Sequence, residues 1–192
     1  FRLVNSSNAI FCFRMDSDDI ALDNRFSIQL EFMKKNAYID ILGSQAIYID
    51  ENEKVIGVSN KPLTDKDIKL NLYKNPLIHP TVIFKVESIL KAGNYNYYYP
   101  HGQDYELWMR SAYLKLTFLN LEKPLIKYRV SKKPKYNFKT LLYELTIGIY
   151  WLPKLKSNFY NYFMITGRFF YRSILYFFYK IKNKKFYNPF KD

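Results

Sequence analysis

The stretch that decides the fold is Ala9-Ile10-Phe11-Cys12-Phe13-Arg14-Met15-Asp16-Ser17-Asp18-Asp19, an apolar run that ends in three carboxylates. A short, continuous apolar run is typical of a buried β-strand. In open α/β sheets, ligands bind beyond the carboxyl ends of the strands. The sequence therefore predicts a strand over residues 9–15, with an acidic ligand site directly after it.

Helical and extended patterns alternate after this stretch, which indicates an α/β domain. Asp23 and Thr64 precede two of the helical patterns and are expected to cap them. The expected helices span residues 23–35, 64–73, 86–91 and 103–114. The expected strands span residues 38–50 (with a break at Gly43-Ser44), 54–59, 81–85, 116–120 and 124–129.

Charge divides the chain into two parts. Residues 1–130 carry 17 Lys/Arg against 15 Asp/Glu, whereas residues 131–192 carry 13 against 2. The second part is also rich in Tyr and Phe, and its pattern predicts helices over about 137–150 and 158–181, separated by Pro153. We therefore expect one domain over residues 1–130 and a basic, aromatic, helical tail over residues 131–192.

Cysteine and histidine usage excludes two classes of protein. One Cys and two His leave no internal disulfide framework and make a zinc cluster very improbable. The chain opens on Phe1 without a basic segment followed by an apolar one, so a secretory signal is not expected. These features favour the reducing cytoplasm.

The acidic cluster is a candidate metal site. At the end of a strand, Asp16 and Asp18 would point to the same side, because side chains alternate. Two converging carboxylates repel one another unless a cation lies between them, and Mg²⁺ or Mn²⁺ prefers such oxygen ligands. The alternative is a solvated acidic cluster at the start of a helix.

A resemblance sharpens this interpretation. The run Arg14-Met15-Asp16-Ser17-Asp18-Asp19-Ile20, followed by Arg25 and Gln29, resembles glycosyltransferase family 2 of the GT-A fold. Further segments similar to that family follow in the same order over about residues 8–130. They are Ile39-Asp40-Ile41-Leu42-Gly43-Ser44, Asn75-Pro76-Leu77-Ile78-His79-Pro80-Thr81, Ala92-Gly93-Asn94-Tyr95, Gln103-Asp104-Tyr105-Glu106-Leu107-Trp108-Met109-Arg110 and Leu125–Arg129.

The resemblance implies a partial GT-A, Rossmann-like mixed sheet flanked by helices, followed by carboxyl-terminal amphipathic helices. It also implies a metal-dependent, inverting hexosyltransferase that uses a nucleoside-diphosphate sugar. Asp16 and Asp18 would hold Mn²⁺ or Mg²⁺ and the donor diphosphate, with Asp18 the preferred direct ligand. Asp104 matches the catalytic base, which takes the proton of the acceptor hydroxyl.

Four further residues are candidates for the acceptor site or its pocket: His79, Gly93, Gln103 and Trp108. Gln103 replaces the usual Glu of the family, and Asn94 replaces a Gly in a turn where Asn tolerates positive φ. Structural alternatives stay open at this point. Asp104 could cap its helix, His79 could hold a loop, and Trp108 fits a core position better than a sugar platform.

The aromatic, basic tail suits a helix that lies on an anionic membrane surface. Arg168 and Arg172 argue against a membrane-spanning helix, and packing on the domain is the alternative. Nucleic acid is not expected as a partner, because no RNA-binding motif is present. The expected location is therefore peripheral, on the cytoplasmic face of the cell membrane.

The main functional expectation is transfer of a sugar to a surface-glycan or lipid-linked acceptor. The alternative is a catalytically inactive, truncated remnant or a membrane-surface binding module. The sequence does not contain the strand, helix and acidic turn with which the family's domain begins. We therefore expect the isolated chain to bind nucleotide sugar poorly.

Overall fold

The computed structural model describes residues 8–131, 138–157 and 159–184. Within these residues, six strands form one mixed sheet in the order β1-β5-β3-β6-β2, with β4 paired to β3. The pair β3–β6 is parallel and the other pairs are antiparallel. The strands are β1 (Phe11–Phe13), β2 (Ile20–Ala21), β3 (Ile41–Ile49), β4 (Val55–Val58), β5 (Ile83–Lys85) and β6 (Phe118–Arg129).

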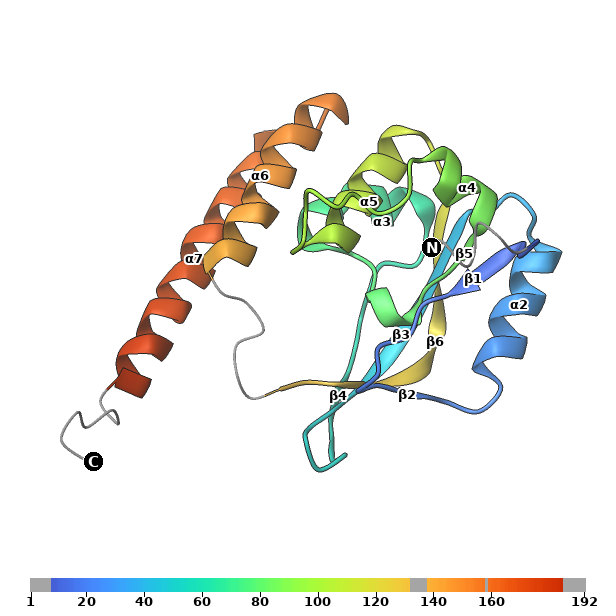
Figure 1. Cartoon of the computed structure of the whole chain (residues 1–192), viewed down its shortest axis with the longest axis horizontal. Coiled ribbons are helices and arrows are strands. Elements are labelled where there is room, and N and C mark those ends of the chain that lie inside the picture. The colour runs from blue at the N-terminus through green and yellow to red at the C-terminus, as the bar shows by residue number, and fades with distance from the viewer. Residues whose placement is uncertain (1–7, 132–137, 158, 185–192) are drawn as a thin grey trace.

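Helices cover both faces of the sheet (Figure 1). Helix α2 lies against one face, and α3, α5 and the paired α6 and α7 lie on the other. The helices are α2 (Arg25–Lys35), α3 (Asp65–Leu70), α4 (Val86–Lys91), α5 (Gln103–Tyr113), α6 (Phe138–Lys154) and α7 (Phe159–Lys184). Two 3₁₀ turns complete the described elements, η1 (Leu72–Lys74) and η2 (His79–Thr81). The expected α/β class with a mixed, helix-flanked sheet is confirmed.

Side chains that alternate along the central strand β3 pack against the helices on both faces of the sheet. Ile41 belongs to the core under α5, while its neighbour Leu42 packs with Met33 of α2. Successive side chains of a strand point to opposite faces, so an unbroken apolar strand is buried on both. Ile41 and Leu42 are fully buried, and Met33 is 1% exposed.

Most predicted elements are present, and two predicted details of capping and turns are confirmed. Thr64 caps α3 by accepting a hydrogen bond from the Asp67 backbone N–H at 3.2 Å. Asn94 adopts a left-handed backbone with φ of 62°. Asp23, in contrast, was the wrong cap for α2: the capping position is Asn24, with φ of 61° and no side-chain hydrogen bond.

Two predicted breaks are absent, and a third lies at a different position. Strand β3 is continuous through Gly43-Ser44. Gly43 leaves room for the Asn120 side chain, because a Cβ at this position would lie 2.2 Å from Asn120 Oδ1. The two strands expected at 116–120 and 124–129 are one strand, β6, with register shifts opposite Ser44–Ala46. The two tail helices are separate as expected, but Pro153 lies inside α6, next to its last residue, and the separation follows Lys154.

The basic tail packs on the domain through its first helix and part of its second. Ile147, Trp151 and Leu152 of α6 and Ile165 of α7 belong to the same buried cluster as Trp108 of α5. These contacts fit the packed-helix alternative for this part of the tail. None of the helices in the described part of the chain is both long and apolar enough to cross a bilayer.

Candidate active site

The acidic cluster lies in the turn between β1 and β2. Ligand oxygens of Asp16, Asp18 and Asp19 all lie within 4.8 Å of one another. Asp16 is ion-paired with Arg14, and Asp19 Oδ1 accepts a hydrogen bond from the Arg129 backbone N–H at 2.8 Å. The cluster therefore sits on a backbone fixed to β6, and Asp18 is its most exposed member.

The buried side chain of Arg25 fixes the acidic turn through hydrogen bonds to the backbone. Arg25 of α2 is fully buried, and its Nη2 atom donates to the backbone oxygens of Arg14 and Pro80, each at 2.8 Å. Its Nε atom donates to Gln29 Oε1 at 3.1 Å, and Gln29 donates in turn to the Thr81 carbonyl at 2.8 Å. Burial lowers the pKa of Arg25 to about 10, opposed by the charge of Asp19, so the guanidinium stays charged at neutral pH. Arg25 thus ties the acidic turn to the His79-Pro80 turn.

Asp104 approaches the same region from the start of α5. The residue at the N-cap is Gly102, so Asp104 lies within the first turn of the helix and is not its cap. Asn75 Nδ2 donates to Asp104 Oδ2 at 3.1 Å, which fixes the orientation of the carboxylate. Asn75 itself has a left-handed backbone, with φ of 53°, at the end of η1.

Three of the predicted residues meet in one cleft. Asp16, His79 and Asp104 line a cleft of about 360 Å³, a volume within the usual range for small-molecule sites. Its charged lining side chains are Asp16, Lys61, Lys74, Asp104, Glu144, Arg168 and Arg172. A carboxylate from the acidic turn and a carboxylate from a helix start, expected separately from the sequence, therefore face one space.

His79 is held in this cleft as a neutral side chain. Its Nε2 atom lies 2.8 Å from the Tyr95 hydroxyl, and its ring contacts Trp108 at a centroid distance of 6.0 Å. Burial lowers the pKa of His79 below its ordinary value, although Asp104 and Asp16 oppose the shift. The ring can therefore exchange hydrogen bonds in the cleft without adding a positive charge beside Asp104 at neutral pH.

The remaining predicted residues do not line this cleft. Trp108 is fully buried in the core, as its helical face indicated, and acts on the cleft through the His79 ring. Gly93 has φ of 89° in the turn before Tyr95, and Gln103 is exposed at the first position of α5. Asp18 faces solvent at the rim formed by the acidic turn.

The turn around Gly93 is fixed from α5. Arg110 donates to the backbone oxygens of Ala92 and Asn94, and it is ion-paired with Glu106 at 2.8 Å. Glu106 is almost fully buried, so this pair anchors the turn that delivers Tyr95 to His79. Gly93 therefore serves the shape of the pocket and does not contact its contents.

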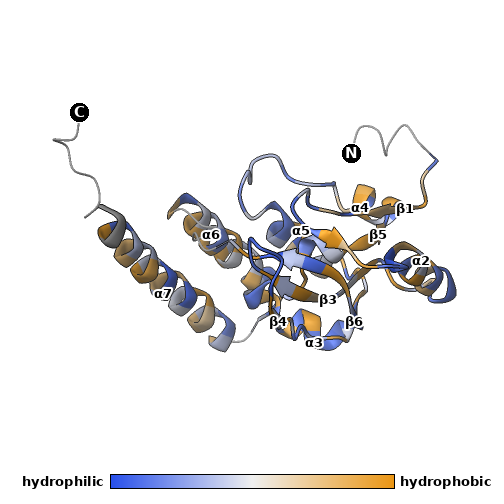
Figure 2. Ribbon diagram, turned by 90° about the horizontal axis from the view of Figure 1, so that it is seen from below, coloured by the Kyte–Doolittle hydropathy of each residue, from blue (hydrophilic) through white to orange (hydrophobic). Residues whose placement is uncertain are grey.

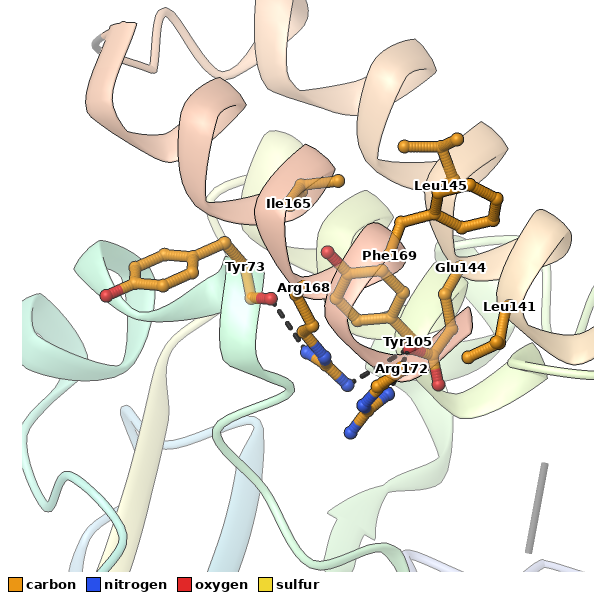
Figure 3. A pocket seen from close by; sticks show the side chains of 9 residues that line it. All are labelled: Tyr73, Tyr105, Leu141, Glu144, Leu145, Ile165, Arg168, Phe169 and Arg172. Atoms are coloured by element: carbon orange, nitrogen blue, oxygen red, sulfur yellow. Dashed lines mark hydrogen bonds and ion pairs between the residues drawn. The ribbon is translucent and has the colours of Figure 1, made fainter. Parts of the chain in front are cut away.

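Several charged residues of the cleft were missed from the sequence. Arg168 and Arg172 of α7 both donate to Glu144 Oε2 of α6, at 3.0 and 2.7 Å (Figure 3). Arg168 also donates to the Tyr73 carbonyl at 2.8 Å. A signal was present: Glu144 is one of only two acidic residues in 131–192, and the two arginines are four residues apart on one helix face.

The acidic turn has the right chemistry for a hard divalent cation. Clustered carboxylate oxygens suit Mg²⁺ or Mn²⁺, which keep water and phosphate oxygens as their other ligands. Asp19 is engaged by the β6 backbone, whereas Asp18 is exposed and Asp16 lines the cleft. Asp18 and Asp16 are therefore the residues that would hold the ion, with Asp16 exchanging its ion pair with Arg14 for the metal. Such an ion would supply positive charge to a diphosphate bound there.

The fold of the chain is similar to that of a solved structure. The structure of Staphylococcus aureus TarS 1–349 in complex with UDP-GlcNAc matches with a TM-score of 0.53 at 14% identity, over 76% of this chain and 44% of that one. At this identity the match establishes a shared fold. No protein-family model matches the sequence.

The chain is also similar in sequence to proteins that are named as glycosyltransferases. An uncharacterized glycosyltransferase of Methanocaldococcus jannaschii, MJ1057, is 32% identical over 183 residues, which are 92% of this chain and 62% of the relative. The Escherichia coli UDP-Gal:alpha-D-GlcNAc-diphosphoundecaprenol beta-1,3-galactosyltransferase is 35% identical over 62% of this chain and 44% of the relative. The chain is thus homologous to glycosyltransferases over most of its length, and it spans about half the length of the curated relatives it matches.

Proposed function

We propose that the chain forms the acceptor-side part of a family 2 glycosyltransferase. This enzyme would move a hexose from a nucleoside-diphosphate donor, with inversion, onto a surface-glycan or lipid-linked acceptor. The observation that carries the proposal is the single cleft lined by Asp16, His79 and Asp104. The donor and acceptor classes are supported by the names of the relatives, one of which acts on a sugar diphospholipid.

Asp104 would act as the general base in this cleft. A sugar hydroxyl is a weak nucleophile, and a carboxylate within hydrogen-bond reach accepts its proton as the new bond forms. Asn75 orients the carboxylate through its 3.1 Å hydrogen bond, and neutral His79 adds no competing charge beside it. Mn²⁺ or Mg²⁺ at Asp16 and Asp18 would offset the charge of the departing diphosphate.

The metal assignment is tested by mutating the full-length gene product. Asp18→Asn keeps the shape of the side chain but removes the charge of the most exposed member of the cluster. We expect Mn²⁺-dependent sugar transfer to fall by about 100-fold or more, because mutation of even the outer partners of metal ligands costs about 10- to 100-fold. Asp23→Asn, an exposed aspartate outside the cluster, is the matched control. Transfer at the control rate by Asp18→Asn would sink the metal assignment.

A second observation favours a membrane-surface role for α7. Figure 2 shows hydrophobic and hydrophilic residues interleaved along this helix, and large apolar side chains are exposed on it. They include Phe159, Phe163, Phe170, Tyr171, Ile174, Leu175, Phe177 and Phe178. We propose that this surface lies on anionic lipid at the cytoplasmic face of the cell membrane, with aromatic rings at the level of the headgroups.

Sedimentation with anionic and neutral vesicles tests the membrane role. Deleting the whole tail is a poor test, because Ile147 and Trp151 belong to the core. The double variant Phe177→Gln/Phe178→Gln should release the protein from anionic vesicles. Tyr97→Gln/Tyr98→Gln removes two equally exposed rings outside α7 and should leave binding unchanged. Equal loss in both variants, or in neither, would contradict a surface specific to α7.

A further inference from the structure

The cleft contains more positive charge than the donor site requires. Lys61, Lys74, Arg168 and Arg172 line it on the side of η1, α6 and α7. The carboxylate among them is Glu144, which accepts from both arginines through the same oxygen, Oε2. Figure 3 shows the two guanidinium groups side by side at the edge of the α6–α7 pair. Along this side of the cleft the described lining holds four cations and one carboxylate, so the region favours an anion.

Lys61 strengthens this arrangement from the sheet side. Its Nζ atom donates to the neutral Asn75 carbonyl at 3.1 Å. Burial lowers the pKa of Lys61, and the charges of Arg168 and Arg172 lower it further. A bound anion would reverse that unfavourable interaction, because it would place negative charge among three cations that now repel one another.

Asn75 links the cationic group to the proposed base. Its backbone oxygen accepts from Lys61, and its side-chain amide donates to Asp104. One residue therefore contacts both the proposed base and one of the cations of the cleft. An anion held by Lys61 and the arginines would belong to the molecule that Asp104 deprotonates.

We propose that Lys61, Arg168 and Arg172 form a second anion subsite, which binds the diphosphate of a lipid-linked sugar acceptor. The proposal rests on the proposed function, since Asp104 marks the acceptor side of the cleft. It separates two diphosphates by chemistry: the donor's at the carboxylate turn, through a metal ion, and the acceptor's at guanidinium and ammonium groups without one.

The two sides of α7 fit such an acceptor. Arg168 and Arg172 point toward Glu144 and the cleft, whereas Tyr171 and Phe178 of the same helix are exposed. A diphosphate joined to a lipid chain lies at the boundary between headgroup and hydrocarbon. Arginines that could bind phosphate and exposed aromatic rings on the same helix match the two parts of that ligand.

Calorimetry without divalent metal tests the subsite on the 192-residue chain. The probes are inorganic diphosphate and a sugar diphosphate with a short alkyl chain, both in excess chelator. We expect saturable binding of both, weakened about tenfold in Arg172→Gln, since hydrogen bonds to charged groups are involved. Lys180→Gln removes one charge from an exposed position of the same helix and should leave affinity unchanged. Absence of saturable binding, or equal affinity in wild type and Arg172→Gln, would overturn the proposal.

Glu144→Gln separates ligand binding from a purely structural ion pair. If the arginines only anchor α7 through Glu144, this variant loses stability and its affinity for diphosphate is unchanged or lower. A true subsite predicts tighter diphosphate binding, because a competing carboxylate is removed. Arg172→Lys, which retains the charge, should bind with intermediate affinity, and melting temperatures of all variants confirm that each is folded.

Binding of the donor shows whether the arginines hold the diphosphate of the donor or that of the acceptor. In the full-length gene product, UDP-sugar binding with Mn²⁺ should weaken in Asp18→Asn and persist in Arg172→Gln. The reverse pattern would assign the arginines to the donor and overturn the acceptor assignment. Metal-free binding at the arginines with no effect of Asp18→Asn on transfer would contradict the proposed metal site while leaving the subsite intact.

Discussion

Arg25 offers a direct test of how the acidic turn is held. Replacing it with Met keeps a long side chain on α2 but removes the guanidinium that donates to Gln29, Arg14 and Pro80. The two backbone oxygens would then be buried without this donor. The acidic turn and the His79-Pro80 turn would lose their common anchor.

The magnitude follows from these hydrogen bonds. Each contributes about 1 kcal/mol net, and each buried acceptor left unsatisfied costs about 1–3 kcal/mol. Relief of burying the charge offsets part of the loss, which leaves about 3–5 kcal/mol from the lost hydrogen bonds and the two unsatisfied acceptors. With a urea slope of about 2 kcal/mol/M, the unfolding midpoint of Arg25→Met should fall by about 2 M.

Urea unfolding followed by tryptophan fluorescence measures this shift. Lys34→Met makes the same kind of change at an exposed position of α2 and should move the midpoint by less than about 0.3 M. A midpoint for Arg25→Met within that range would refute the role of Arg25 as the anchor of the turn.

Two further predictions concern Gly43 and His79. Gly43→Ala should lower stability by about 1–3 kcal/mol in urea unfolding, because the added Cβ would overlap the side chain of Asn120; Gly57→Ala, which meets no atom nearer than 3.9 Å, should change it by less than about 1 kcal/mol and serves as control. Burial lowers the folded-state pKa of His79 below its unfolded value of about 6.5, so the unfolded state binds the proton more readily and stability is lost as pH falls below about 6.5. His79→Asn should therefore lose less stability than wild type between about pH 7.5 and 5.5; an equal loss in both proteins would show that His79 does not titrate in this way.

The sequence predicted elements whose patterns are local. The apolar run before Asp16 and the cap at Thr64 depend on residues a few positions apart, and both are found as expected. The break expected at Gly43 is absent for a non-local reason. The glycine leaves room for the side chain of Asn120 on the neighbouring strand β6. Nothing in the residues around Gly43 indicates that contact.

The site shows the same division. The resemblance selected Asp16, His79 and Asp104, which the structure brings into one cleft. The spacing of Arg25 and Gln29 was noted, but their complete burial was not predicted, since charged residues are almost never fully buried unless paired. The cations of α7 were assigned to a membrane helix. The placement of Arg168 and Arg172 beside the cleft depends on the packing of α6 against α5 and α7, which the tail sequence alone does not encode.

The central claim is that the cleft between Asp16 and Asp104 is where sugar transfer takes place. Asp104→Asn keeps the size of the side chain and removes its ability to accept a proton. Steady-state transfer in the protein as its gene encodes it, with Asp23→Asn as control, measures the effect on kcat and on the donor KM separately. We predict a fall in kcat of about 100- to 10,000-fold with the donor KM nearly unchanged, as for loss of a general base. A kcat for Asp104→Asn equal to that of the control would contradict the account.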